Sequence, residues 1–541
     1  MSVGLGTFDF IVLGLYFVVI VSIGLYFAKK EKTSADYFLA GRNMVWVGVG
    51  ASLFAANISS EHFIGLAGSG AARGLAVGHF EWWASIIVLI LGWVFVPFYL
   101  RSKVFTMPEF LERRYGRSSR MYLTTVSIVA YVITKISVTL FAGGLLLNKV
   151  LGVDISTAAI ILVIATGIYT IAGGLKAVIY TDIIQTGILI TGAITLTILG
   201  LHQVGGFSGL EQKLPADFFH MFKSIHDPDF PWTGIIFGAP ILGIWYWCTD
   251  QYIVQRVLSA RNLDHARSGT IFAGFLKILP VFMLVLPGMI AKALYPNIAG
   301  DDAYPTLVTS NLLPVGIKGI VVASLLAALM SSLASCFNSS STLFTMDFYR
   351  NFKPNASEKE LVFVGRLATA VLVIFGILWV PFIKYLSSQI YIYLQSVQAY
   401  ISPPIAAVFI LGILWKRVNA KGAIWSLITG AIVGAFRLIV ELLFKAGKIS
   451  GSFWKVIALT NFLHFAIFLF LVSVIVLVVV SLLTEKPDRE QINGLTFSTI
   501  SGISDESLDE SLKENKTWKK VNILLSILLV LIIISLWIKF F

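Results

Sequence analysis

Long apolar stretches recur from one end of the chain to the other. About 20 consecutive apolar residues suffice for a helix to cross the hydrocarbon core of a bilayer. Stretches of that kind predict about 14 membrane-spanning helices, near residues 8–28, 44–72, 80–100, 121–147, 155–174, 178–203, 234–255, 269–293, 316–347, 362–383, 389–413, 423–444, 456–483 and 521–539. The pattern therefore predicts an all-α polytopic membrane protein.

Composition agrees with this pattern. Of the 541 residues, 57% are hydrophobic and 13% are charged, and the mean hydropathy is +0.85. Soluble domains carry about 25% charged residues. The net charge of +12 is spread over short loops without a basic, aromatic-rich patch, which argues against nucleic acid as a partner.

The distribution of Lys and Arg predicts an orientation. The segments richest in these residues are 28–43, 101–120, 256–267, 348–366, 414–421 and 484–520, and poorer segments alternate with them. Basic loops stay in the cytoplasm. We therefore expect both termini outside, in a multi-pass protein of the plasma (cell inner) membrane. Cys248 and Cys336 both lie in apolar stretches, so no disulfide framework is expected.

Several polar residues fall inside the predicted spans. The ionisable ones are Glu81, Lys135, Asp182, Asp250 and Lys277, with Gln395 as a neutral companion. Each alone can serve as packing glue or in a structural ion pair. Together they indicate a hydrated path or a polar site within the bundle.

The sharpest interruption runs from Asn57 to His62, where five of six residues are polar in the middle of a span. A helix that unwinds at such a place frees backbone carbonyls, which then need partners other than lipid. Broken helices that present carbonyls to Na⁺ are a recurrent feature of secondary transporters. The alternative is an unbroken helix with a polar stripe against its neighbours.

Two further clusters carry candidate chemistry. Ser331, Ser332 and Ser335 lie within one turn of each other. Such hydroxyls usually bond to the preceding turn, but they can also present oxygens to one cation. The run Trp245–Gln251 combines three aromatic rings with Asp250. It suits either a membrane-interface belt or a surface that stacks on a sugar.

At these positions the chain resembles the sodium:solute symporter family, and within it the sodium/glucose cotransporters. The likeness extends over the whole chain and includes Gly50–Phe54, Asn57–His62, Phe80–Trp82, Met107–Glu109, Tyr169–Leu175, Tyr180–Asp182, Trp245–Gln251, Gln255–Arg256, Pro403–Pro404 and Trp415–Asn419. The resemblance implies the leucine-transporter-like inverted repeat of five plus five helices, transport by alternating access, and no enzymatic activity.

The resemblance also implies a division of the chain. A first peripheral helix and loop would occupy 1–43, and the two repeats would occupy 44–203 and 234–413, separated by an outside loop at 204–233. Two further helices would lie at 414–483, a cytoplasmic linker at 484–520 and a last, peripheral helix at 521–541. A monomer would suffice for transport.

Individual roles follow only from the resemblance. The sugar contacts would be Asn57, His62, Glu81, Tyr246, Trp247, Lys277 and Gln395. The outer gate would consist of Leu66, Phe80 and Tyr391, and the inner gate of Tyr246. Sodium, the co-transported ion, would bind Ala55, Ile58, Ala328, Ser331 and Ser332. Asp182 and Ser335 would mark a second sodium or coupling site.

Departures from the family pattern leave the substrate open. Gly243 stands where sugar-transporting relatives place Asn or Thr, Ala84 where a galactose carrier uses Ser, and Gln398 where animal glucose carriers have a smaller residue. Ala334 replaces a hydroxyl that assists a second sodium, which favours one sodium per sugar. We expect a neutral monosaccharide of the glucose or galactose type. The alternatives are another polyol or sugar acid, such as myo-inositol or sialic acid, or a sugar-gated sensor or sodium channel.

Overall fold

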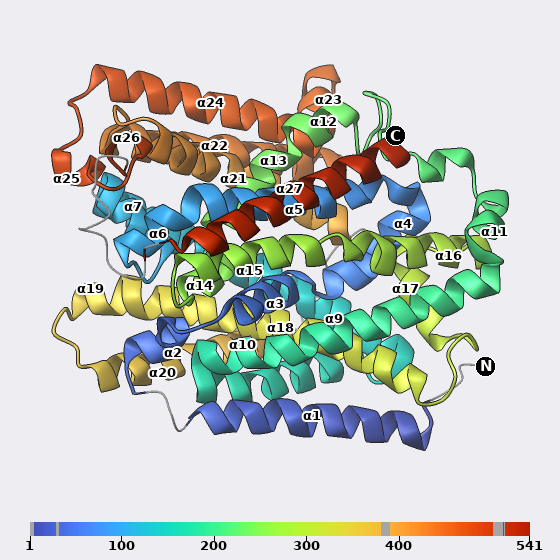
Figure 1. The fold of residues 1–541 in the computed structure, drawn as a ribbon. Helices are drawn as coiled ribbons and strands as arrows, with labels where there is room; N and C mark the ends of the chain where they lie inside the picture. The colour runs from blue at the N-terminus through green and yellow to red at the C-terminus, as the bar shows by residue number, and fades with distance from the viewer. Residues whose placement is uncertain (1–4, 29–31, 380–389, 501–511, 513) are drawn as a thin grey trace.

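The computed structural model describes residues 5–28, 32–379, 390–500, 512 and 514–541. Helices dominate these residues, and the only β-structure among them is two isolated bridges. Figure 1 shows a bundle of roughly parallel helices. Segments labelled η are short 3₁₀ or π-helical turns, most of them continuous with an α-helix.

The helices follow one another in five groups. The first is α1 (Thr7–Ala28), α2 (Ser34–Leu39) and η1 (Ala40–Arg42). The second is α3 (Trp46–Asn57), η2 (Glu61–Leu66), α4 (Ala67–Arg73), η3 (Gly74–Gly78), α5 (His79–Ile90), η4 (Leu91–Phe95), α6 (Val96–Ser102), α7 (Met107–Tyr115), α8 (Arg117–Ala130), η5 (Tyr131–Ile136), α9 (Ser137–Leu151) and α10 (Ile155–Val204). The third, in the loop region, is α11 (Gly206–Lys213) and η6 (Ala216–Phe219).

The fourth group is α12 (Trp232–Phe237), α13 (Ala239–Ile244), η7 (Trp245–Thr249), α14 (Gln251–Leu258), α15 (Leu263–Leu276), η8 (Val281–Val285), α16 (Leu286–Leu294), η9 (Gly300–Asp302), α17 (Ala303–Thr309), α18 (Ile317–Leu343), η10 (Phe344–Tyr349), α19 (Arg350–Phe352), α20 (Glu358–Trp379) and α21 (Ile390–Leu414). The fifth is α22 (Ala420–Lys445), α23 (Ser452–Leu459), α24 (Phe462–Leu483), α25 (Arg489–Ile492), α26 (Phe497–Ile500) and α27 (Lys516–Lys539).

Eleven helices among the described residues are long and apolar enough to cross a membrane. This number is smaller than the 14 expected spans because two expected spans form one helix and two others are interrupted. The spans expected at 155–174 and 178–203 form one element, α10, kinked at Gly174 with φ 51° and ψ −155°. Such a backbone suits only glycine. The spans expected at 44–72 and 234–255 are each interrupted, so neither forms one long helix. Residues 380–383 and 389 lie outside the described part.

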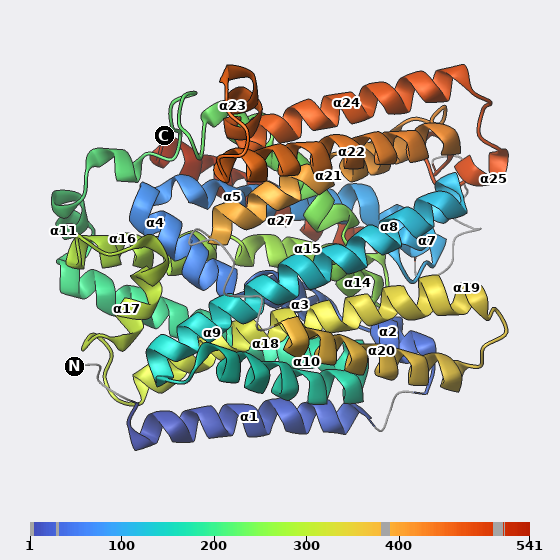
Figure 2. The ribbon, with the colours of Figure 1, turned by 180° about the vertical axis from the view of Figure 1, so that it is seen from behind.

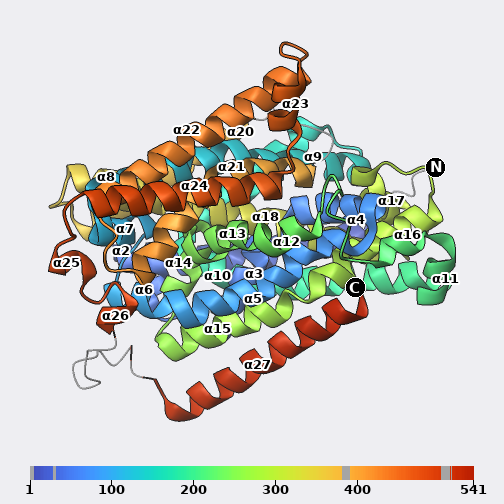
Figure 3. The same ribbon diagram turned by 90° about the horizontal axis from the view of Figure 1, so that it is seen from above.

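The core of the bundle is formed by contacts between helices that are far apart in the sequence. α10 packs along α18, α1 and α3, and α15 packs along α3 and α5. Figures 1, 2 and 3 place both termini at the same end of the bundle. Several of the basic segments, around α2, α7, α19 and α25, lie at the opposite end. That arrangement is what the predicted orientation requires, although which end is cytoplasmic stays a prediction.

Two expectations about the C-terminal region need refinement. The linker at 484–520 contains α25 and α26, and α25 contacts α7; residues 501–511 and 513 lie outside the described part. The last helix, α27, runs along the periphery (Figure 3) but contacts both α15 and α5. These are helices that carry predicted site residues.

Candidate functional site

The predicted helix break is present in the structure. α3 ends at Asn57, and Ile58 has extended backbone angles of φ −74° and ψ 108°. A π-helical segment, η2, resumes at Glu61. A second break lies at Asp250, also extended, between η7 and α14. Paired discontinuous helices are the arrangement in which transporters place substrate and ion sites.

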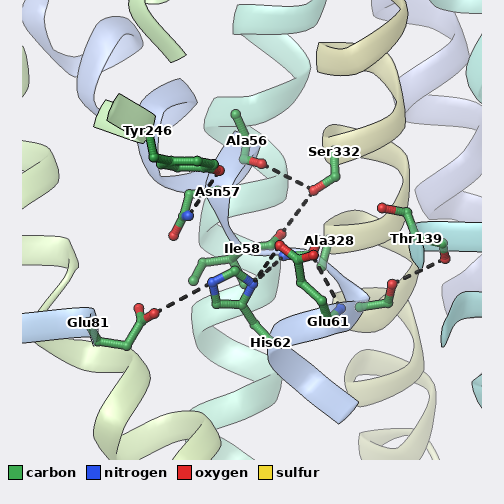
Figure 4. A network of polar contacts seen from close by, with 12 residues as sticks. Ala56, Asn57, Ile58, Glu61, His62, Glu81, Thr139, Tyr246, Ala328 and Ser332 are labelled. Atoms are coloured by element: carbon green, nitrogen blue, oxygen red, sulfur yellow. Dashed lines mark hydrogen bonds and ion pairs between the residues drawn. The ribbon is translucent and has the colours of Figure 1, made fainter. Parts of the chain in front are cut away.

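Oxygen atoms from the first break meet the hydroxyls of α18. The Ser331 hydroxyl lies within hydrogen-bond distance of two carbonyls, that of Ala55 at 2.9 Å and that of Ala328 at 3.1 Å, and can donate its one hydrogen to either. The Ser332 hydroxyl lies 3.5 Å from the Ile58 carbonyl (Figure 4). All five predicted sodium ligands thus come together, and each is buried. Neutral carbonyl and hydroxyl oxygens are suitable ligands for a hard monovalent cation.

A polar cavity lies beside this oxygen cluster. It is lined by every predicted sugar contact, namely Asn57, His62, Glu81, Tyr246, Trp247, Lys277 and Gln395, together with Glu61, Phe80, Trp83, Ala84, Gly243, Tyr391 and Gln398. The lining residues come from the first break, α5, α13, η7, the C-cap of α15 and α21. The cavity therefore joins segments far apart in sequence, as a central substrate site requires.

Lys277 organises one wall of the cavity. Its ammonium forms an ion pair with Glu81 and donates to the Asn57 side-chain oxygen at 2.5 Å. The two charged side chains are almost fully buried. The Asn57 amide donates in turn to the Tyr246 hydroxyl at 3.1 Å (Figure 4). The chain of contacts fixes the direction of each group facing the cavity.

His62 lies between two carboxylates. Its Nε2 is 3.6 Å from Glu81 and its Nδ1 is 3.7 Å from Glu61. Nδ1 also accepts the Ser59 N–H at 3.3 Å. That acceptor role places the proton of a neutral ring on Nε2, toward Glu81.

Aromatic rings close the cavity. Tyr246 and Trp247 pack edge to face at 5.3 Å between centroids, and the Lys277 ammonium lies 5.6 Å from the Trp247 ring. Phe80 and Tyr391 pack edge to face at 5.9 Å. Leu66 is fully buried on η2. The two rings predicted for the outer gate therefore meet.

Two ionisable residues of the spans form a pair outside the cavity. The Lys135 ammonium lies 2.7 Å from the Asp250 carboxylate and 3.6 Å from the centroid of the Tyr252 ring. Tyr131 donates to the same carboxylate. The Lys135 ammonium also lies 4.6 Å from the centroid of Tyr246. The Lys135–Asp250 pair therefore contacts the predicted inner-gate residue Tyr246 through the Lys135 ammonium.

Asp182 and Ser335 also lie outside the cavity. Asp182 accepts from the Ser52 hydroxyl at 2.5 Å, and Ser335 accepts from the guanidinium of Arg256. Arg256 is fully buried. The Arg256 guanidinium thus already contacts the Ser335 hydroxyl, which is one of the two groups predicted to bind a second sodium.

An ion-pair cluster lies at the C-terminal end of α4. Arg73 contacts Asp227 at 2.5 Å and Asp229 at 3.1 Å. Burial opposes ionisation of Asp227, but N–H donation from Phe230 and Asp229 and the charge of Arg73 outweigh it, so the pKa of Asp227 lies below its usual value. Arg73, Asp229 and Tyr391 line a second small cavity, and Tyr391 also belongs to the predicted outer gate.

Sequence reasoning missed three contributors. The Ala56 carbonyl accepts from Ser332 at 3.2 Å and from Tyr252 at 2.6 Å, so it belongs to the oxygen cluster. Glu61 lines the cavity. Ser60, within the break, donates to the Thr139 carbonyl at 3.2 Å. Side-chain type gives no signal for a carbonyl such as that of Ala56.

Similarity to known proteins defines the class. The fold matches a solved Na⁺-coupled sialic acid symporter in a substrate-bound outward-open state, with a TM-score of 0.77 and 24% identity over 89% of this chain and 99% of that one. It also matches the nucleobase-cation-symport-1 transporter Mhp1, with a TM-score of 0.55 and 13% identity over 85% and 98%. The fold is that of leucine-transporter-like carriers.

Sequence comparison then gives the family. The profile of the Sodium:solute symporter family matches residues 37–430. Sodium/glucose cotransporter 1 of Oryctolagus cuniculus is 44% identical over 527 residues, covering 89% of this chain and 80% of that protein. Sodium/myo-inositol cotransporter 2 of the same species is 43% identical, covering 91% and 79%. The chain belongs to the sodium:solute symporter family: it is a multi-pass, sodium-coupled symporter and not an enzyme.

Proposed function

We propose that the protein imports a neutral monosaccharide of the glucose or galactose type, driven by sodium, through alternating access. The observation that carries this proposal is the double use of one helix break. Ala55 and Ile58 direct carbonyls to the serines of α18, while Asn57 and His62 from the same break line the polar cavity. An ion that orders the break therefore also orders one wall of the sugar site.

The charge balance of the cavity favours a neutral substrate. Lys277 is paired with Glu81, and His62 lies between two carboxylates. A sugar acid would need an unpaired cation, and Lys277 does not supply one. Hydrogen-bonding groups beside Tyr246 and Trp247 suit the hydroxyls and the C–H faces of a hexose.

Another neutral polyol, such as myo-inositol, is the second candidate. Gly243 and Gln398 both line the cavity, at positions where the residues differ from those of sugar-transporting relatives. Gly243 offers no side-chain hydrogen bond to the cavity, whereas the Gln398 amide offers both a donor and an acceptor. The similarity to a sodium/myo-inositol cotransporter agrees with this alternative.

The mechanism follows from differential binding. External sodium holds the residues at 55–58 against α18, which favours the state with an ordered sugar site. A ligand shifts such an equilibrium only by its difference in affinity for the two states. Sugar binding then closes Phe80 and Tyr391 over the cavity, and Tyr246 releases the sugar inward when its support by Asn57 and Lys135 changes.

We further propose one sodium per sugar. The guanidinium of Arg256 donates to Ser335, so a second cation at that hydroxyl would meet a like charge. One charge moving with the sugar still gains about 2.3 kcal/mol per 100 mV of membrane potential. In this proposal the termini lie outside, the membrane is the plasma (cell inner) membrane, and the monomer is the transporting unit.

The test is uptake into proteoliposomes of a panel of labelled solutes (glucose, galactose, myo-inositol and sialic acid) with sodium, potassium or lithium outside. We expect accumulation of a hexose above the external concentration only with an inward sodium gradient. Accumulation of sialic acid in place of hexoses would contradict the charge argument. Sodium current without sugar accumulation would contradict symport.

A further inference from the structure

The last helix reaches the wall of the polar cavity near its C-terminal end. Trp537 of α27 packs on Trp83 of α5, with 5.2 Å between the ring centroids and an angle of 57° between the ring planes. Trp83 lines the polar cavity, whereas Trp537 does not. The helix that the sequence predicts to be peripheral is therefore one aromatic contact away from the transport site.

Trp83 lies on the side of α5 that faces the cavity. Phe80, Trp83, Ala84 and Ile87 all line the cavity, and their spacing of three, four and seven residues places them on one face of a helix. The indole nitrogen of Trp83 is buried, and it has no acceptor within the described part of the chain. Trp83 therefore presents ring carbons to the cavity, a surface suited to the C–H groups of a sugar.

Two hydrogen bonds fix α27 on either side of Trp537. The Trp93 indole of η4 donates to the Ser526 hydroxyl at 3.0 Å, and the Met221 N–H donates to the Phe540 carbonyl at 2.8 Å. Ser526 lies eleven residues before Trp537, and Phe540 lies three residues after it. The position of Trp537 beside α5 is thus determined by contacts that do not involve Trp83.

Trp537 contacts two rings that are one turn apart on α5. Besides Trp83, it lies against His79, with 6.1 Å between the ring centroids. His79 is fully buried, and its Nε2 lies 3.0 Å from the Met221 carbonyl. The loop before α12 thus holds His79, and His79 in turn packs on Trp537. The Trp83 ring therefore packs against a neighbour that is itself held in place.

We propose that Trp83 contacts the transported sugar and that Trp537 is a positioning residue, which holds the Trp83 ring in its orientation at the cavity. The inference rests on the proposed sugar transport and extends the sugar site to a helix outside the two predicted repeats. Removal of the Trp537 ring opens space behind Trp83, so the Trp83 indole can occupy other staggered rotamers. Sugar binding must then order this ring, which weakens the affinity for sugar. The proposed sodium ligands belong to other elements, the first break and α18, so sodium binding should be unaffected.

Uptake kinetics of the full chain in proteoliposomes test the proposal, with the sugar that the wild type accumulates as the probe. Trp537→Ala should raise the KM for sugar about three- to tenfold, the range expected for the loss of one aromatic pair. Vmax, and the sodium concentration that gives half of it at saturating sugar, should stay unchanged. Trp537→Phe should keep a KM near that of the wild type, because it retains a ring and the Trp537 nitrogen has no acceptor to lose among the described residues.

Two comparisons separate positioning from general packing. Ile538→Ala, at the next residue of α27, should leave the KM unchanged because Ile538 is 71% exposed. Trp83→Ala should raise the KM by itself, and adding Trp537→Ala to it should raise the KM no further, since Trp537 acts through Trp83.

An unchanged KM in Trp83→Ala would overturn the sugar contact. Effects of the two changes that multiply, or a Trp537→Phe variant as impaired as Trp537→Ala, would overturn the positioning role. Failure of the proposed function would show already in the wild type, as absence of sugar accumulation, whereas failure of this inference shows only in the variants.

Discussion

The buried pair of Lys277 and Glu81 gives the most discriminating prediction. Removing one partner of a buried ion pair leaves an uncompensated charge, which costs about 3–5 kcal/mol. Because the pair borders a cavity that water can enter, we take the lower value. Lys277→Met and Glu81→Leu should each lower the free energy of unfolding by about 3 kcal/mol. The exposed pair of Lys353 and Glu360 is the control, and Lys353→Met should leave the free energy of unfolding almost unchanged.

The double variant separates stability from transport. Glu81→Leu/Lys277→Met removes both charges, and apolar replacements of a buried pair are often nearly neutral. The Lys277–Asn57 and Glu81–His62 contacts are then lost as well, at about 1 kcal/mol each. We expect denaturation in detergent to show recovered stability, while sugar uptake stays absent in both single variants and in the double. Additive losses would refute the pairing, and restored uptake would refute a role in sugar binding.

Three further variants probe the remaining parts of the site. Ser332→Ala should insert normally but lose sodium-dependent uptake. Ser339→Ala is the control and should keep that uptake, because the Ser339 hydroxyl donates to the Ser335 carbonyl of its own helix. Normal sodium dependence of Ser332→Ala would exclude the Ser332 hydroxyl as a sodium ligand. Tyr246→Phe keeps the ring but loses the Asn57 contact, so the KM for sugar should rise roughly fivefold, for about 1 kcal/mol, with Vmax little changed; an unchanged KM would remove this hydroxyl from the site. A Cβ on Gly65 would lie 2.7 Å from the Tyr391 Cβ, whereas one on Gly187 would meet nothing within 4 Å. Gly65→Ala should therefore lose transport and Gly187→Ala should not, and equal activity of the two would contradict a role for the close approach of Gly65 and Tyr391.

Much of the fold was predictable because the bilayer imposes a length on each helix. Apolar runs located the spans, and the polar interruption at Asn57–His62 located the break. The second break was not predicted, because the short polar run Thr249–Gln251 after three aromatic residues fits a continuous helix as well as a broken one. The Asp250 carboxylate caps α14 by accepting from the Tyr252 N–H at 3.1 Å, and such capping follows from geometry that composition does not reveal.

The candidate site was predictable for side chains and not for backbone atoms. Residue type identified Lys277 and Glu81 as polar groups at membrane depth, and the structure shows that they face one another. Lys135 gave the same signal, yet it pairs with Asp250 outside the cavity. Ala56 gave no signal, because its contribution is a carbonyl exposed by the break. Sequence therefore identifies candidates, and the packing of α3, α15 and α18 decides which of them meet.

The central claim is that one helix break couples sodium to sugar. The most direct measurement is the dissociation constant of the purified protein for its sugar, with saturating sodium and with potassium in its place, for the wild type and for Ser332→Ala. We predict that sodium tightens sugar binding in the wild type, that sugar tightens sodium binding by the same factor, and that Ser332→Ala loses both effects. Equal sugar affinity with and without sodium in the wild type would contradict the account.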